Sequence, residues 1–113
     1  MKLANTLALV FMMAMSIFAH AAYKDTNSVK VNQISVWTNT GSILVQTTPR
    51  PDISGLNCSN DYWLVLDKND AGYQAALSML LSAQATQKSV NVSAEENGGG
   101  ECCRLRRVVN LSN

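Results

Sequence analysis

The chain has 113 residues, with nine lysines and arginines against eight aspartates and glutamates and a formal net charge of +1. Proteins that bind nucleic acid need a basic surface to displace phosphate counterions, so this balance argues against a nucleic-acid partner and against docking on anionic lipid. The length suits one small domain and not two.

Residues 1–21 have the pattern of a secretory signal peptide. A short basic start precedes an apolar run over residues 3–18, and Ala19 and Ala21 are the small side chains that signal peptidase requires. The apolar run is too short for a comfortable membrane span. We therefore expect cleavage after Ala21, a single domain over residues 22–113, no stable membrane anchor after cleavage, and a secreted or periplasmic location.

The first extended segments follow directly. Residues 22–28 are polar, and we expect them to be frayed. Alternating apolar residues predict a strand over residues 29–38, with a bulge where the phase shifts at Asn32. A turn signal and the run 42–48 predict a second strand, paired to the first as a hairpin.

A third strand is predicted over residues 61–67, after a loop that two prolines begin. This strand is rich in aromatic and branched residues. Because adjacent strand residues point to opposite faces, we expect one of Tyr62 and Trp63 to be in the core and the other on the surface.

The hydrophobic period then changes to that of a helix, over residues 70–86. Asn69 or Asp70 can cap its start through a side-chain oxygen. One apolar stripe should face the core; its members are Tyr73, Ala76, Leu77, Leu80 and Leu81. The opposite face is uncharged; its members are Gln74, Ser78, Ser82 and Gln84.

Two more strands, over residues 89–93 and 102–111, are separated by a glycine-rich loop. The chain is thus mainly β with one helix, in the order β-β-β-α-β-β, which is typical of the OB-fold, a five-stranded Greek-key barrel. Closure of the barrel also protects the edges of short strands. A split sheet with the helix packed on one face is the alternative architecture.

Three cysteines remain after cleavage, and all would lie in an oxidising compartment. We expect a disulfide from Cys58 to either Cys102 or Cys103, with a strained bond between the adjacent pair as the alternative. A bridge across about 45 residues contributes roughly 4 kcal/mol on the chain-entropy estimate. We expect the remaining thiol to be buried, with an intermolecular link as the alternative.

Catalysis and metal binding have little support in the sequence. Cleavage removes His20, the sole histidine, and with it every Ser-His or Cys-His pair and every imidazole metal site. Asp67 and Asp70 can be interpreted as a carboxylate pair, but a strand end and a helix cap explain them better. We therefore expect no enzyme activity, no cofactor and no metal.

Two groups of side chains are candidates for ligand binding. Arg104 and Arg106, together with Arg107, can pair with the carboxylate of an acidic glycan or another anion. A solvated strand face, offset by nearby glutamates, is the simpler explanation of that cluster. Trp37 and Trp63 are aromatic residues that can stack on a sugar ring.

Several of these features coincide in one pattern: Cys58 before Tyr62-Trp63-Leu64, a helix followed by Lys88-x-Val, and Gly100-x-Cys before the last strand. The chain resembles, over roughly residues 29–111, a group of small secreted bacterial proteins with this pattern. It is similar, more distantly, to the B subunit of subtilase cytotoxin, an OB-fold that forms a pentameric ring and binds sialylated glycans.

The resemblance implies a Cys58–Cys102 disulfide, because Cys102 occupies the cysteine of the Gly-x-Cys pattern. Cys103 would then face the same side as Leu105, Val109 and Leu111, and a bulge or rim position would be needed because Arg107 interrupts that face. Gln87 departs from the group, in which many members have glycine.

The resemblance also implies a function. It predicts a non-enzymatic binding module that recognises a glycan or a protein partner. In ring-forming B subunits the equivalent helix lies between subunits, so the uncharged helix face is a candidate homo-oligomer contact, with a simple exposed polar face as the alternative. The alternative is a monomeric accessory or inhibitor protein of the cell envelope.

Overall fold

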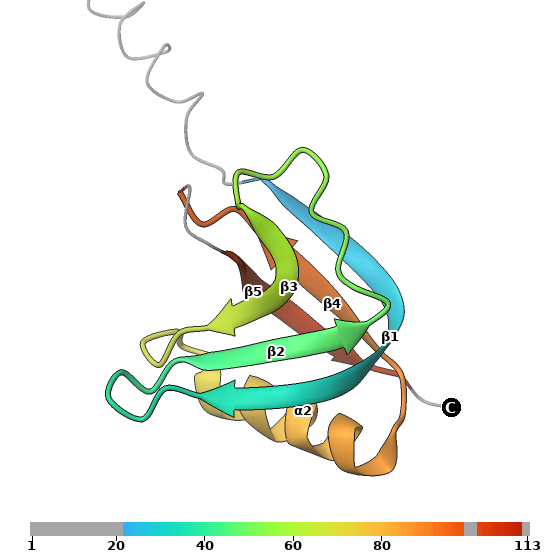
Figure 1. The fold of residues 1–113 in the computed structure, drawn as a ribbon. Helices are drawn as coiled ribbons and strands as arrows, with labels where there is room; N and C mark the ends of the chain where they lie inside the picture. The colour runs from blue at the N-terminus through green and yellow to red at the C-terminus, as the bar shows by residue number, and fades with distance from the viewer. Residues whose placement is uncertain (1–21, 99–101, 112–113) are drawn as a thin grey trace, which may run out of the picture.

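The computed structural model describes residues 22–98 and 102–111, so the predicted signal peptide lies outside the described residues. Their elements are β1 (Tyr23–Val36), β2 (Ile43–Thr48), β3 (Asn60–Leu66), α2 (Tyr73–Thr86), β4 (Val90–Glu95) and β5 (Cys102–Asn110). The strands close into a barrel in the order β1-β2-β3-β5-β4 (Figure 1). β3 and β5 are parallel, and the other neighbours are antiparallel. The predicted OB-fold-like barrel is confirmed, and the split sheet is wrong.

β1 is longer than the sequence predicted, because the segment expected to be frayed is its first half. Tyr23 pairs with Glu95 and Val29 with Val90, so this half lies along β4. The second half lies along β2. β1 therefore pairs with two neighbouring strands, and the backbone N–H and C=O groups of its polar first half find hydrogen-bond partners in β4.

Two irregularities bend β1 from one neighbour to the other. The predicted bulge is confirmed by a register shift between Val31 and Gln33. A second shift was not predicted and lies between Thr26 and Val29, where Ser28 has a φ of 58° and its N–H donates to the side-chain oxygen of Asn91 at 2.9 Å. Bulges increase strand twist, which helps the barrel to close.

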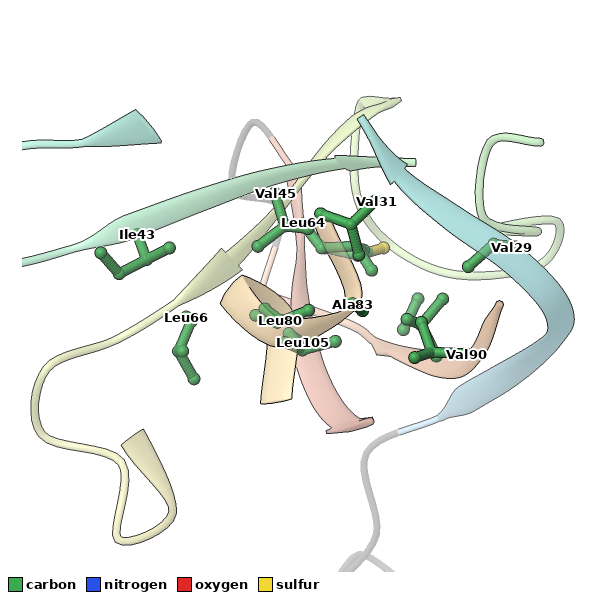
Figure 2. Close-up of a cluster of buried hydrophobic side chains, with 13 residues drawn as sticks. Val29, Val31, Ile43, Val45, Leu64, Leu66, Leu80, Ala83, Val90 and Leu105 are labelled. Carbon is green, nitrogen blue, oxygen red and sulfur yellow. The ribbon is translucent and has the colours of Figure 1, made fainter. Parts of the chain in front are cut away.

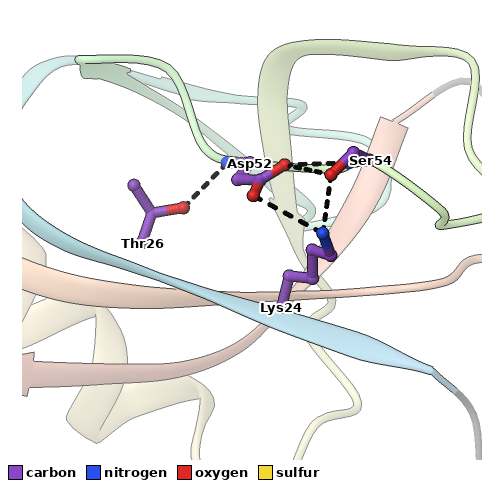
Figure 3. Close-up of polar contacts among 4 residues, drawn as sticks. All are labelled: Lys24, Thr26, Asp52 and Ser54. Carbon is purple, nitrogen blue, oxygen red and sulfur yellow. Dashed lines mark hydrogen bonds and ion pairs between the residues drawn. The ribbon is translucent and has the colours of Figure 1, made fainter.

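The β2–β3 loop, residues 49–59, covers the first half of β1 (Figure 3). The Asp52 N–H donates to the Thr26 hydroxyl at 2.7 Å. Lys24 donates to the Ser54 hydroxyl at 2.6 Å, and its ammonium lies 3.6 Å from the Asp52 carboxylate. The Ser54 backbone N–H, its hydroxyl and Lys24 together hold the pKa of Asp52 below its ordinary value of 3.8. The first half of β1 lacks an apolar pattern because this polar loop covers it.

The core fills the barrel with side chains from all five strands and from α2 (Figure 2). Its buried members are Val29, Val31, Ile43, Val45, Leu64, Leu66, Leu80, Ala83, Val90, Val92, Ala94, Cys103 and Leu105. The predicted helical stripe is confirmed for Leu80 and for three residues packed against the core, Tyr73, Ala76 and Leu77. It is wrong for Leu81, which is 48% exposed; the inward position about one turn after Leu80 belongs to Ala83.

The ends of α2 differ from the prediction. Gly72 is the N-cap and makes no side-chain capping bond, so the expected cap from Asn69 or Asp70 is wrong. At the other end, Gln87 adopts the left-handed conformation with a φ of 56°, where glycine is the commonest residue. The Gln87 side chain donates to the Gln84 carbonyl at 2.8 Å, which satisfies a carbonyl of the last turn.

The disulfide joins Cys58 to Cys103, with 5.3 Å between the two Cα atoms. The Cys58–Cys102 pairing implied by the resemblance is therefore wrong, and the alternative partner is the correct one. Cys103 pairs with Leu64 across the sheet and is fully buried on the inner face, where Cys58 packs against the core. Cys102 lies outside this bond and is half-buried, in contrast to the expected buried thiol.

Candidate functional site

Three segments meet at one end of β2 and β3, which we call the cleft end. Two of them are connections, the β1–β2 turn (residues 37–42) and the β3–α2 loop (residues 67–72), and the third is the start of α2 (Figure 1). The Tyr73 hydroxyl donates to the Gly41 carbonyl at 2.8 Å, so the helix start is tied to the turn. Two hollows border this end, and Asp70 and Ala71 of the β3–α2 loop line both of them.

The first hollow, the turn cleft, has a volume of about 430 Å³. Its lining residues are Thr38, Asn39, Thr40, Gly41, Lys68, Asp70, Ala71, Tyr73 and Gln74. Most of them offer hydrogen-bonding side chains. Trp37 precedes them in the chain and is 59% exposed, so a flat aromatic surface lies at the same turn as this polar hollow.

The turn itself is held by its backbone. The Trp37 N–H donates to Ser42 O at 2.9 Å, and the Gly41 N–H donates to Trp37 O at 2.7 Å. Gly41 has a φ of 78°, and a Cβ at this position would lie 2.7 Å from Cδ of Lys68. The turn therefore depends on glycine for its backbone angle and for the approach of the lysine.

The second hollow, the arginine cleft, has a volume of about 450 Å³ and lies between α2 and β5. Its lining residues are Leu66, Asp70, Ala71, Gly72, Ala75, Ala76, Met79, Glu95, Arg104, Leu105, Arg106, Arg107 and Val108. On the helix side most of these residues are alanine or glycine. Such short side chains leave space between helix and strand that larger residues would fill.

A bulge in β5 places the arginines. Ser93 pairs with Arg107 and Ala94 with Leu105, so Arg106 is the extra residue of the strand. Strict alternation would send Arg107 into the barrel, and the predicted bulge avoids this. Val108 packs against the core, where the sequence had predicted Val109.

Ion pairs link these arginines to neighbouring elements. Arg104 forms an ion pair with Asp70, which also accepts a hydrogen bond from the Asp67 N–H at 3.1 Å. Asp70 lines both clefts, so this pair lies between them. Arg106 lies 3.7 Å from the Glu95 carboxylate, and its guanidinium lies 3.7 Å from the Tyr23 ring centroid.

Trp63 belongs to a different surface. Its ring contacts that of Tyr62 edge-on, with centroids 5.3 Å apart, and Arg50 lies 5.0 Å from the Tyr62 centroid. Tyr62 is exposed and Trp63 half-buried, so the prediction that one of them would be a core residue is wrong. The physical reason is the register irregularity between Asn60 and Leu64, which breaks the alternation of faces.

The structure thus brings together two of the four predicted ligand residues. Arg104 and Arg106 share the arginine cleft. Trp37 directly precedes the turn residues that line the turn cleft without lining it, and Trp63 lines neither cleft. The sequence did not indicate Tyr73 as a polar anchor, because its hydroxyl bond is to a turn far away in the chain. The ion pair of Asp70 with Arg104 was missed for the same reason: the two residues are distant in sequence, and the local sequence indicated only a helix cap at Asp70.

Within residues 22–98 and 102–111, no group of three or more His, Cys, Asp or Glu side chains is placed to hold a metal ion. Among the same residues, none of the helices has both the length and the apolar character to cross a membrane. Comparison of the chain with protein-family models, curated proteins and solved structures finds no match.

Proposed function

We propose that the protein is a secreted or periplasmic, non-enzymatic binding domain that recognises a glycan at the turn cleft. The observation that carries this proposal is the exposed Trp37 at the start of the turn whose next residues line a polar hollow of about 430 Å³. A sugar ring offers an apolar face for stacking and hydroxyl groups around its edge. The tryptophan and the polar lining match these two features.

The fold supports the same location. In OB-folds, the β1–β2 connection is among the loops that bind oligosaccharides and oligonucleotides. The backbone bonds of the turn and the Tyr73–Gly41 bond order this site before any ligand arrives. Pre-ordering reduces the entropy cost of binding. The near-neutral charge of the chain favours a glycan over a nucleic acid.

The Cys58–Cys103 disulfide supports the location in the cell. Disulfides persist in oxidising compartments, such as the periplasm and the extracellular space. The signal-peptide pattern over residues 1–21 agrees with this location. Residues 22–113 contain no histidine, which supports a role in binding without catalysis.

The test is a glycan array followed by calorimetric titration of the best glycan against the purified protein. We expect Trp37→Ala to weaken binding roughly tenfold or more, because the sugar ring loses its stacking surface. Tyr62→Ala is the matched control, because Tyr62 is an exposed aromatic residue outside both clefts. Its affinity should equal that of the wild type. Absence of any bound glycan, or full affinity of Trp37→Ala, would overturn the proposal.

A homo-oligomer is part of the same proposal, and α2 is the surface that supports it. The exposed face of the helix is uncharged and includes Gln74, Ser78, Leu81 and Ser82. Gln84 was predicted to belong to this face, but its side chain donates to the Asn32 carbonyl at 3.2 Å. Light scattering should give a solution mass equal to a fixed number of subunits, as a closed ring requires. A monomer would favour an envelope accessory or inhibitor protein.

A further inference from the structure

We infer that the arginine cleft is a second binding site, which takes a small organic carboxylate with an apolar tail. This site lies beside the turn cleft, shares Asp70 and Ala71 with it, and is proposed independently of glycan binding. Its volume of about 450 Å³ lies within the usual range for small-molecule sites. Its two kinds of lining, apolar within and cationic at the rim, indicate the two halves of the ligand.

The apolar lining comes from three elements. Leu66 of β3 and Leu105 of β5 are buried core residues that also border the cleft. Met79 of α2 and Val108 of β5 are half-buried there. A hydrocarbon tail would remove this surface from water, and the flexible Met79 can adapt to its shape.

The charged rim favours an anionic head group. Asp70 is paired with Arg104, and Glu95 with Arg106, so each carboxylate of the rim already has its arginine. In the described part of the chain, Arg107 forms no ion pair, although Asp25 borders a smaller hollow that Arg107 also lines. The rim therefore has one cation in excess, and a guanidinium group suits a carboxylate.

Both halves of the ligand are needed for this match. A simple anion such as acetate would leave the apolar lining in contact with water, and a neutral alcohol would leave the excess charge unmatched. A linear carboxylate of medium length satisfies both. It can place its tail between α2 and β5 while the head stays at the exposed rim with Arg107.

The experiment is a calorimetric titration of the purified protein with octanoate, with octanol as the uncharged probe and acetate as the probe without a tail. We expect octanoate to bind roughly tenfold more tightly than either of the others. Methyl NMR should show the Met79 signal shifting with octanoate, because this side chain lines the cleft. A Met79→Leu sample identifies that signal.

Two variants test the two halves. Ala75→Phe fills the cleft from an exposed helix position and should abolish octanoate binding. Arg107→Gln should weaken the affinity for octanoate roughly fivefold and leave the affinity for octanol unchanged. Arg50→Gln is the matched control, because Arg50 is an arginine outside the cleft, paired with Asp61 at 3.4 Å. Thermal melts verify that each variant is folded, and Arg107→Gln remains informative if the bulky phenylalanine disturbs α2.

Octanoate that fails to bind, or that binds Ala75→Phe and Arg107→Gln as tightly as the wild type, would overturn this inference. Equal affinity for octanoate and acetate would also overturn it, since the apolar lining would then have no role. The result is independent of the glycan test. Trp37→Ala should keep its octanoate affinity, and Ala75→Phe should keep its glycan affinity.

Discussion

The two ends of β2 and β3 use their polar residues in opposite ways. At the end formed by the β2–β3 loop and the first half of β1, which we call the braced end, polar groups bond to one another. Lys24, Thr26, Asp52 and Ser54 form one network, and the disulfide fixes the loop to β5. At the cleft end, polar and charged groups surround two hollows.

This difference separates an internally bonded end from the end at which we propose binding. Tyr73 and Asp70 at the cleft end also make internal bonds, but the polar groups there border hollows large enough for a small ligand. A small barrel has a limited core, so a disulfide at one end adds to the stability of the whole domain. If the proposed sites are correct, stabilisation and recognition are divided between the two ends.

The largest expected effect is loss of the crosslink at the braced end. Cys58→Ala opens a bridge between residues 45 positions apart. On the chain-entropy estimate, this should lower the free energy of unfolding by about 4 kcal/mol. Urea denaturation followed by far-UV circular dichroism measures the change.

Cys102→Ala is the matched control for the crosslink. It removes a thiol adjacent to Cys103 and leaves the Cys58–Cys103 bond in place, so its unfolding curve should stay close to that of the wild type. Peptide mapping without reduction should recover Cys58 joined to Cys103. A fragment joining Cys58 to Cys102 would contradict the structure.

The next effect compares two glycines, one at each end. Gly41 and Gly55 have φ values of 78° and 79°, so alanine at either site should cost roughly 1 kcal/mol. Gly41 also lies against Lys68, whereas a Cβ on Gly55 would have no atom within 4 Å. Gly41→Ala should therefore be the more destabilising of the two by denaturation, with roughly 1–2 kcal/mol in total.

Binding distinguishes the same two variants more sharply. Gly41→Ala should also weaken glycan binding, because Gly41 lines the turn cleft and its carbonyl accepts the hydrogen bond from the Tyr73 hydroxyl. Gly55→Ala should leave glycan affinity unchanged. Equal loss of affinity in the two variants would mean that the cleft end is not the glycan site.

The order of elements was predictable because it depends on local patterns. Period-two alternation identified the strands, the change of period identified α2, and the phase shift at Asn32 identified a bulge. The start of β1 was missed because its inner side is covered by a polar loop and not by the core. The alternation of apolar residues reports contact with a core, so it is silent where a loop forms the cover.

The candidate site was predictable only in part, for a related reason. The arginines near the start of β5 are adjacent in sequence, so their cluster was visible, and Trp37 was visible next to a turn. The two clefts arise from contacts between distant segments, such as Asp70 with Arg104 and Tyr73 with Gly41. The disulfide partner was also uncertain, because adjacent cysteines differ only in which face of β5 they occupy.

A smaller effect compares two buried hydroxyls. Thr47, just before the β2–β3 loop, donates to the Pro49 carbonyl at 2.8 Å. Ser93 on β4 is equally buried, and its hydroxyl has no hydrogen-bond partner within the described residues. Thr47→Val should destabilise by about 1 kcal/mol and Ser93→Ala should stabilise by up to about 1 kcal/mol, since removal of an unsatisfied hydroxyl relieves its desolvation cost. Chemical denaturation at neutral pH measures both, and a loss of stability in Ser93→Ala would show that its hydroxyl is satisfied.

The smallest effect is a pH dependence at the braced end. The pKa of Asp52 is lowered by the Ser54 hydrogen bonds and by Lys24, so its carboxylate binds protons less readily in the folded chain than in the unfolded one. Its contribution to stability is therefore complete above the ordinary pKa of 3.8 and is lost as the pH falls through the lower folded value. Asp52→Asn should have a slightly lower urea midpoint than the wild type at neutral pH, and the difference should vanish in strong acid.

Added salt separates the two causes of this difference. Because Asp52 is exposed, salt should reduce the part that comes from Lys24 and leave the part that comes from the Ser54 hydrogen bonds. A difference that persists unchanged at the lowest pH would assign the effect of the substitution to packing of the loop and not to the charge of Asp52.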